Sequence, residues 1–204
     1  STSEKLAAMA AYVGSASAAD AAIAAYFLSG QRVLRSVPTK LLYKLCLETA
    51  ELPGWLIDAC YESVGDFSET IALLLPDAGD GTNASLAQVY ATLIEPLASS
   101  EDDARRSIIL QAWDRMDVRQ RYVYHKLIRG GLRVGVQKKM VVRAIAMAHD
   151  LEPAVVAARM SGVMAPTVAY YESIIKPDAG EDLARPLPFY LAHQLDEPPR
   201  HLLG

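Results

Sequence analysis

The chain has 204 residues, enough for one large domain or two small ones and for a sizeable hydrophobic core. Hydrophobic residues make up 51% and charged residues 22%, as in ordinary globular proteins, and the formal net charge of −4 does not by itself indicate a nucleic-acid partner. No run approaches ~18 apolar residues, and the N-terminus lacks the pattern of a secretory signal, so we expect no membrane partner. We interpret Cys46 and Cys60 as core thiols of a cytoplasmic protein.

Helix signals dominate the chain, since alanine is abundant and alternating β-branched runs are scarce. We predict helices over residues 3–13, 18–28, 39–50, 53–64, 67–75, 85–97, 101–116, 117–129, 137–149, 153–160 and 167–174. Gly65 and Asp66 are expected to separate two of them, with the acid capping the second. Trp55 and Trp113 have apolar neighbours and are expected in the core.

The last thirty residues differ from the rest, because prolines crowd them. No fixed-period repeat of the kind that solenoids require is visible. We therefore predict an all-α fold, a single compact domain of roughly ten helices over residues 1–175. A proline-rich, extended exit segment is expected over residues 176–204.

Positive charge is distributed unevenly along the chain. Residues 118–149 contain no acid and eight bases: Arg119, Arg121, Lys126, Arg129, Arg133, Lys138, Lys139 and Arg143. A second acid-free stretch, residues 21–47, contains Arg32, Arg35, Lys40 and Lys44. The remainder has 24 acids against eight bases, so two basic segments in an acidic chain indicate a surface that binds a polyanion. The alternative is a solvated basic face without a ligand.

A glycine-rich turn connects two basic helices. Gly130, Gly131 and Gly135 would let the backbone approach a ligand closely, and the helix expected from residue 137 would offer free N–H groups to a phosphate. Arg133, projecting from this turn, could enter a groove or bind a phosphodiester. The same residues could equally form a helix cap and a tight turn with no ligand. The turn lacks the Gly-Lys-Ser/Thr of a nucleotide-binding P-loop.

Several segments together carry a family likeness. The clearest is Leu-Ile-Arg-Gly-Gly-Leu-Arg-Val-Gly-Val at residues 127–136, followed by Lys138 and an Ala-rich helix; Val-Gly-Asp-Phe-Ser-Glu-Thr at residues 64–70 and the segments 27–32, 37–42 and 188–195 add to it. These segments resemble the N-terminal DNA-binding domain of ATP-dependent DNA ligases, and the early ones are similar to a bacterial subgroup.

The resemblance implies a helical domain that encircles nicked duplex DNA together with two catalytic domains of the same polypeptide, touching backbone and minor groove largely without sequence preference. It also implies ATP and Mg²⁺ as cofactors of the full-length ligase. The nucleophilic lysine of such ligases lies in a Lys-x-Asp-Gly motif, which this chain lacks; Lys176-Pro177-Asp178-Ala179 has Ala in place of Gly. We therefore expect no catalysis and no cofactor in this chain, and a cytoplasmic, nucleoid-associated location in a bacterium.

The basic segments and the resemblance together define a candidate DNA-binding set. It consists of Arg32, Thr39, Lys40, Gly65, Lys126, Arg129, Gly130, Gly131, Leu132, Arg133, Gly135, Lys138, Lys139 and Arg143. Two other functions fit the same composition. One is a sequence-specific regulator of the helix-turn-helix type, whose second helix would read base edges. The other is a helical protein–protein scaffold, which the acidic remainder would allow.

Overall fold

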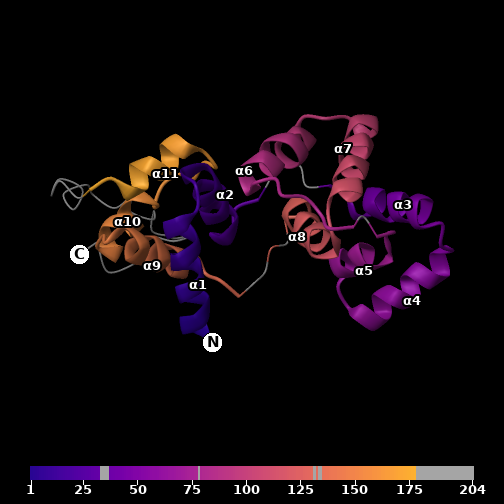
Figure 1. Cartoon of the computed structure of the whole chain (residues 1–204), viewed down its shortest axis with the longest axis horizontal. Helices are drawn as coiled ribbons and strands as arrows, with labels where there is room; N and C mark the ends of the chain where they lie inside the picture. The colour runs from indigo at the N-terminus through magenta and orange to yellow at the C-terminus, as the bar shows by residue number, and fades with distance from the viewer. Residues whose placement is uncertain (33–36, 78, 131, 133–134, 178–204) are drawn as a thin grey trace, which may run out of the picture.

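The computed structural model describes residues 1–32, 37–77, 79–130, 132 and 135–177 and contains no strand among them (Figure 1). The α-helices are α1 (Thr2–Ser15), α2 (Ala18–Leu28), α3 (Thr39–Ala50), α4 (Gly54–Val64), α5 (Phe67–Leu74), α6 (Leu86–Val89), α7 (Asp102–Arg115), α8 (Val118–Ile128), α9 (Lys138–His149), α10 (Pro153–Arg159) and α11 (Val168–Ile175). A π-helix, η1 (Tyr90–Ile94), and a 3₁₀-helix, η2 (Glu95–Ala98), follow α6. The predicted all-α fold is confirmed. The predicted exit segment lies outside the described residues beyond Pro177.

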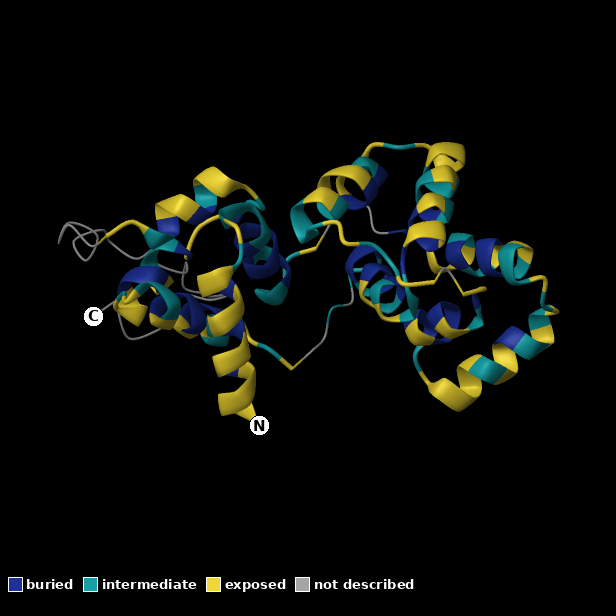
Figure 2. Ribbon diagram, in the orientation of Figure 1, coloured by how far each residue is buried: buried dark blue, intermediate teal, exposed yellow. Residues whose placement is uncertain are grey.

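The buried side chains form two clusters, which Figure 2 shows as two blue interiors. One cluster lies within the central lobe, defined as α3 to α8, and includes Ile57, Trp113 and Tyr124. The other lies within the terminal lobe, defined as α1, α9, α10 and α11, and includes Ile145 and Tyr171. The terminal lobe thus joins the beginning of the chain to helices that follow the glycine-rich turn. None of the described helices is both long enough and apolar enough to cross a membrane.

Helix α2 belongs to both clusters. Its Ile23 and Phe27 pack in the central lobe, whereas Ala21, Ala22 and Ala25 pack in the terminal lobe. The small alanine side chains allow neighbouring helices to approach closely on that side. A helix that is buried on opposite faces connects the two lobes through its own packing.

The helix starts follow the capping chemistry that the sequence contains. The side chains of Ser17, Asp66 and Asp117 accept hydrogen bonds from backbone N–H groups at the starts of α2, α5 and α8. Gly65 ends α4 in the left-handed conformation, with φ of 76°. The predicted break at Gly65 and the cap at Asp66 are confirmed.

Two expectations from the sequence are wrong. The single helix predicted over residues 85–97 divides into α6, η1 and η2, because Pro96 has no N–H to donate and its ring would clash with a regular α-helical turn. Trp55 is 70% exposed, whereas Trp113 is 1% exposed and lies in the core as expected. In α4 only Ile57 is buried. Trp55 precedes it by two residues, which is a rotation of about 200° around the helix axis, so Trp55 lies on the opposite side of α4.

A hydrogen-bonded histidine lies in the middle of the central lobe. The Trp113 indole Nε1–H donates to His125 Nε2 over 2.7 Å, so the other ring nitrogen, Nδ1, carries the proton and donates to the Ser68 carbonyl at 3.1 Å. The imidazole is therefore neutral. Burial lowers the pKa of His125 to about 4, the Ser68 carbonyl opposes that shift, and the charges of Arg121 and Arg129 add to it.

This arrangement predicts a specific pH dependence of stability. The pKa of His125 is lower in the folded state than its ordinary value of 6.5, so the unfolded chain binds the proton more tightly and stability falls as pH drops from 6.5 towards 4. The expected loss is about 1 kcal/mol per pH unit in urea unfolding measured between pH 6.5 and 5. His125→Gln should flatten this slope, leaving a smaller contribution from His149, whose pKa burial also lowers. A stability that increased with acidity over this interval would contradict a neutral His125.

Candidate nucleic-acid interface

The end of α8 lies against the segment that follows α2. The Val37 N–H donates to the Ile128 carbonyl at 3.0 Å, and the Tyr26 hydroxyl donates to the Arg32 carbonyl at 3.0 Å. Gly130 has a φ of 67°, and a Cβ built on it would lie 3.0 Å from Arg32 Cδ. Glycine is therefore favoured at residue 130, both by the left-handed backbone and by the close passage of Arg32.

Arg129 connects three elements at this junction. Its guanidinium lies 5.0 Å from the centre of the Phe67 ring and donates to Ser68 Oγ at 3.1 Å and to Thr39 Oγ1 at 3.4 Å. The guanidinium has five N–H groups in a planar fork, so these two hydrogen bonds leave others able to bind a phosphate. The side chain is thus held in place before any ligand arrives.

Lys126 is paired within the protein. Its ammonium forms an ion pair with the Asp66 carboxylate, and it lies 5.4 Å from the centre of the Tyr122 ring. Burial alone would raise the pKa of Asp66, but the hydrogen bond from Lys126 and those from the Glu69 and Ser68 backbone N–H groups outweigh it and lower that pKa. Gly65 precedes this acid and is exposed. The ion pair makes Lys126 a stabilising contact between α8 and α5.

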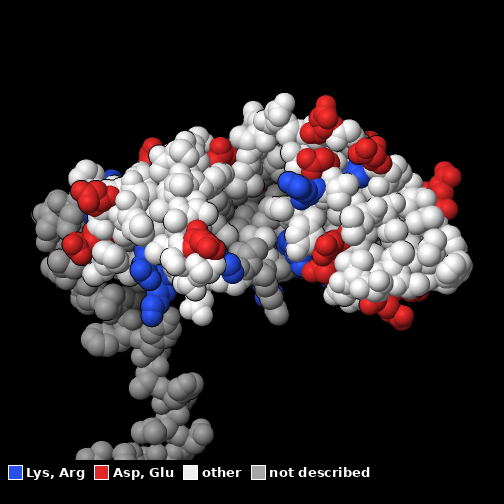
Figure 3. Space-filling view, turned by 60° about the horizontal axis from the view of Figure 1, so that its bottom comes forward, with Lys and Arg blue, Asp and Glu red and all other residues white. Residues whose placement is uncertain are grey.

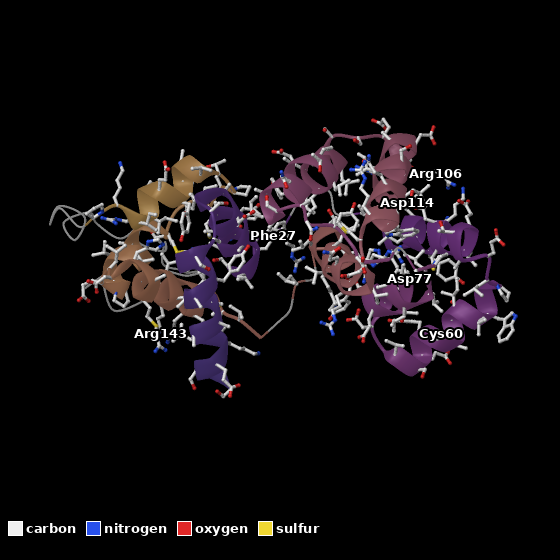
Figure 4. All side chains as sticks on the ribbon, in the orientation of Figure 1. Phe27, Cys60, Asp77, Arg106, Asp114 and Arg143 are labelled. Atoms are coloured by element: carbon white, nitrogen blue, oxygen red, sulfur yellow. The ribbon has the colours of Figure 1, made fainter. Side chains whose placement is uncertain are left out.

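The basic residues of α9 divide into one that is engaged and two that are exposed. Lys138 is half-buried and donates to the Met160 carbonyl at 2.6 Å, at the C-terminal end of α10. Lys139 and Arg143 are exposed and one turn apart, and no ion pair forms with either among the described residues. Figure 4 shows Arg143 projecting from α9 on the side of α1.

A further cation lies beside the glycine-rich turn. Gly135 has a φ of 66°, and a Cβ built on it would lie 2.9 Å from Lys5 Nζ. Lys5 comes from α1, which packs against α9. No local signal identified Lys5 in the sequence, because it lies beside Glu4 and about 130 residues from the turn. Its place next to the turn comes from the packing of the terminal lobe.

The other predicted site residues have different surroundings. Lys40 is exposed and lines a depression of about 400 Å³ between α3 and the start of α7, whose other lining residues include Lys44, Arg106 and two aspartates. Leu132 is half-buried and packs against the core of the central lobe, so it has a packing role. Gly131 and Arg133 lie outside the described residues, and the predicted role of Arg133 stays a prediction.

The basic segment also contains a residue that is part of the core. Arg121 is 3% exposed, and its guanidinium donates to the carbonyls of Trp113 and Pro76. The number of cations in residues 118–149 therefore overstates the charge available to a ligand. In the face shown in Figure 3, Lys and Arg atoms nevertheless lie on both lobes, as do Asp and Glu atoms, several of which lie along the outer edge of the central lobe.

ATP and Mg²⁺ are the cofactors that the resemblance implies for a full-length ligase, and the expectation that this chain binds neither stays a prediction. No group of three or more His, Cys, Asp or Glu side chains in the described part of the chain could hold a metal ion. The sequence also lacks the Lys-x-Asp-Gly motif that would carry the adenylyl group. The absence of catalysis in this chain alone also stays a prediction.

Asp66 has two separate roles that substitutions can distinguish. Asp66→Ala removes both the N-cap of α5 and the partner of Lys126, and should lower the free energy of unfolding by about 2 kcal/mol. Asp66→Asn keeps an oxygen that accepts from the backbone and should cost about 1 kcal/mol. Urea unfolding at pH 7 measures both. An equal loss for the two variants would show that the cap contributes nothing.

Comparison with known proteins identifies the family of this chain. The family model described as DNA ligase N terminus matches residues 1–146, which include every Lys and Arg of the two basic segments and all helices from α1 to α8. The comparison with curated proteins finds no match. The resemblance to the N-terminal domain of ATP-dependent DNA ligases is thereby confirmed, while a bacterial origin stays a prediction. Because the match covers well over half of the 204 residues, the chain belongs to the DNA ligase N-terminal family.

Proposed function

We propose that this chain binds duplex DNA, nicked or intact, through its phosphate backbone and minor groove and without sequence preference. It would hold that DNA for the catalytic domains of the same polypeptide. The observation that carries the proposal is the presence of exposed or partly exposed cations on both lobes: Arg32 and Arg129 at the end of α8, and Lys139 and Arg143 on α9. Membership of the DNA ligase N-terminal family supports it.

Neither of the exposed α9 cations, Lys139 and Arg143, forms an ion pair within the described part of the chain. Like charges one turn apart destabilise a helix by a few tenths of a kcal/mol, and residues 118–149 contain no acid that could offset Lys139 and Arg143. A phosphate near both side chains would remove this repulsion. The first N–H groups of α9 point out of the N-terminal end of the helix, and no side-chain cap occupies them. These groups could therefore bind a phosphate as well.

The composition of α9 favours backbone binding over base reading. A recognition helix needs Asn, Gln or Arg side chains at successive exposed positions. Here Val141, Val142 and Ile145 are buried, and the exposed side chains of the helix are two cations and Met147. This pattern gives little means of distinguishing base pairs. Arg133 and Gly131 remain part of the proposed surface.

Binding should depend steeply on salt. Each neutralised phosphate lowers the logarithm of the association constant by about 0.9 per tenfold rise in salt, so roughly four to six contacts predict a slope near −4 to −5. Fluorescence anisotropy on two unrelated duplexes across a salt series measures this, and both should bind equally. A slope near zero, or a large preference for one duplex, would contradict the proposal.

Single substitutions on α9 should separate binding cations from structural ones. Lys139→Ala and Arg143→Ala should each weaken binding and make the salt slope shallower by about one. Lys138→Met is the matched control, because its ammonium is already bound to the Met160 carbonyl. It should lower the melting temperature and leave the salt slope unchanged. A wild-type slope in both Lys139→Ala and Arg143→Ala would remove α9 from the binding surface.

A further inference from the structure

The outer face of α4 combines an exposed tryptophan with two acids. Trp55, Asp58, Ala59 and Glu62 follow the spacing of one helical face, at positions i, i+3, i+4 and i+7, and all four are exposed. Trp55 is 70% exposed, the largest exposed fraction of any aromatic side chain among the exposed large hydrophobic residues described. Figure 2 shows α4 at the edge of the central lobe with most of its surface open to solvent. The side chains of this face are therefore accessible to a partner.

The segment of sequence that contains this face is acidic throughout. Residues 45–104 contain twelve Asp and Glu and no Lys or Arg. Neither Asp58 nor Glu62 forms an ion pair among the described residues. Asp58 lies near the Tyr43 hydroxyl of α3: burial first, and then the hydrogen bond and charge of Asp58, raise the pKa of that phenol. The face therefore has two carboxylates without an ion pair among the described residues, and one of them, Asp58, is hydrogen-bonded to a neighbouring helix.

The combination of an indole and carboxylates matches the chemistry of a guanidinium. An arginine stacks on an aromatic face and binds a carboxylate through two parallel N–H groups, and tryptophan is the best aromatic partner for a cation. The same lobe contains a related contact, since Arg129 lies 5.0 Å from the Phe67 ring centre. Exposed tryptophans are also among the residues that contribute most to protein–protein interfaces.

We propose that this α4 face, defined as Trp55, Asp58, Ala59 and Glu62, is a docking site for an arginine-bearing segment of a second protein. Arginine of the partner stacks on Trp55 while Asp58 and Glu62 bind its guanidinium groups. The face is distinct from the DNA-binding surface, because its carboxylates would repel phosphates. In this proposal, the protein–protein binding that the sequence also allowed takes place at α4.

A defined peptide tests the proposal with the whole chain. A fluorescein-labelled peptide that alternates glycine and arginine should bind saturably in anisotropy at moderate salt, and a lysine peptide of the same length and charge should bind a few-fold more weakly. The double variant Asp58→Asn/Glu62→Gln should weaken binding of the arginine peptide about tenfold, as should Trp55→Ala. All these side chains are exposed, so circular dichroism should show unchanged folding.

A matched control uses a different acidic pair. Asp102→Asn/Asp103→Asn, at the exposed start of α7, should leave peptide affinity unchanged. An equal loss in this control would overturn the proposal in favour of general attraction to an acidic surface. Wild-type peptide affinity in Trp55→Ala would also overturn it. So would a concentration-dependent dimer in sedimentation velocity that Trp55→Ala disperses, because the occupant would then be a second copy of this chain.

The DNA-binding proposal is tested separately in the same variants. Trp55→Ala should bind duplex DNA with wild-type affinity, whether or not the peptide binds. A loss of DNA affinity in Trp55→Ala would place the α4 face on the DNA surface and overturn the docking proposal. Peptide binding that persists when DNA binding fails would leave the α4 face supported and the DNA proposal contradicted.

Discussion

The packing of α2 is the constraint on which the rest of the structure depends. Five consecutive residues, 21–25, are buried, and four of them enter two different cores: Ile23 one, and Ala21, Ala22 and Ala25 the other. Asp20, at the start of this helix, accepts a hydrogen bond from the Ala87 N–H at 2.7 Å and so joins α2 to α6. The lobes therefore share a helix as well as the connection that follows α8. Helix α2 lies between helices of the terminal lobe and α6 of the central lobe (Figure 1).

Folding determines where the acidic and basic segments of the sequence lie in the structure. Residues 45–104 contribute acids to the central lobe, whereas residues 118–149 cross from the central lobe into the terminal one. At the boundary, Asp66 pairs with Lys126 and fixes the junction of α5 and α8. The cations thus divide into three kinds: Arg121 in the core, Lys126 and Lys138 in pairing contacts, and exposed ones such as Arg143 that a polyanion can reach.

Much of the fold could be predicted because helix boundaries depend on local chemistry. The predicted ranges 18–28 and 39–50 are those of α2 and α3, since a capping serine and a proline mark their starts and Ser29 and Glu51 follow their ends. The exposure of Trp55 could not be predicted, because it depends on α4 lying at the edge of the lobe. The engagement of Lys138 with Met160 and the approach of Lys5 to Gly135 depend on tertiary packing and leave no local pattern.

Hydrogen–deuterium exchange of the chain with and without a nicked duplex tests the central claim most directly, because it reports which backbone segments DNA covers. The account predicts slower exchange at the end of α8 near Arg129 and Gly130, at the start of α3 near Thr39 and Lys40, and in the first turn of α9, with no change in α4. Slower exchange confined to α4 and α5, with the end of α8 and the start of α9 unchanged, would contradict a DNA surface formed by cations of both lobes.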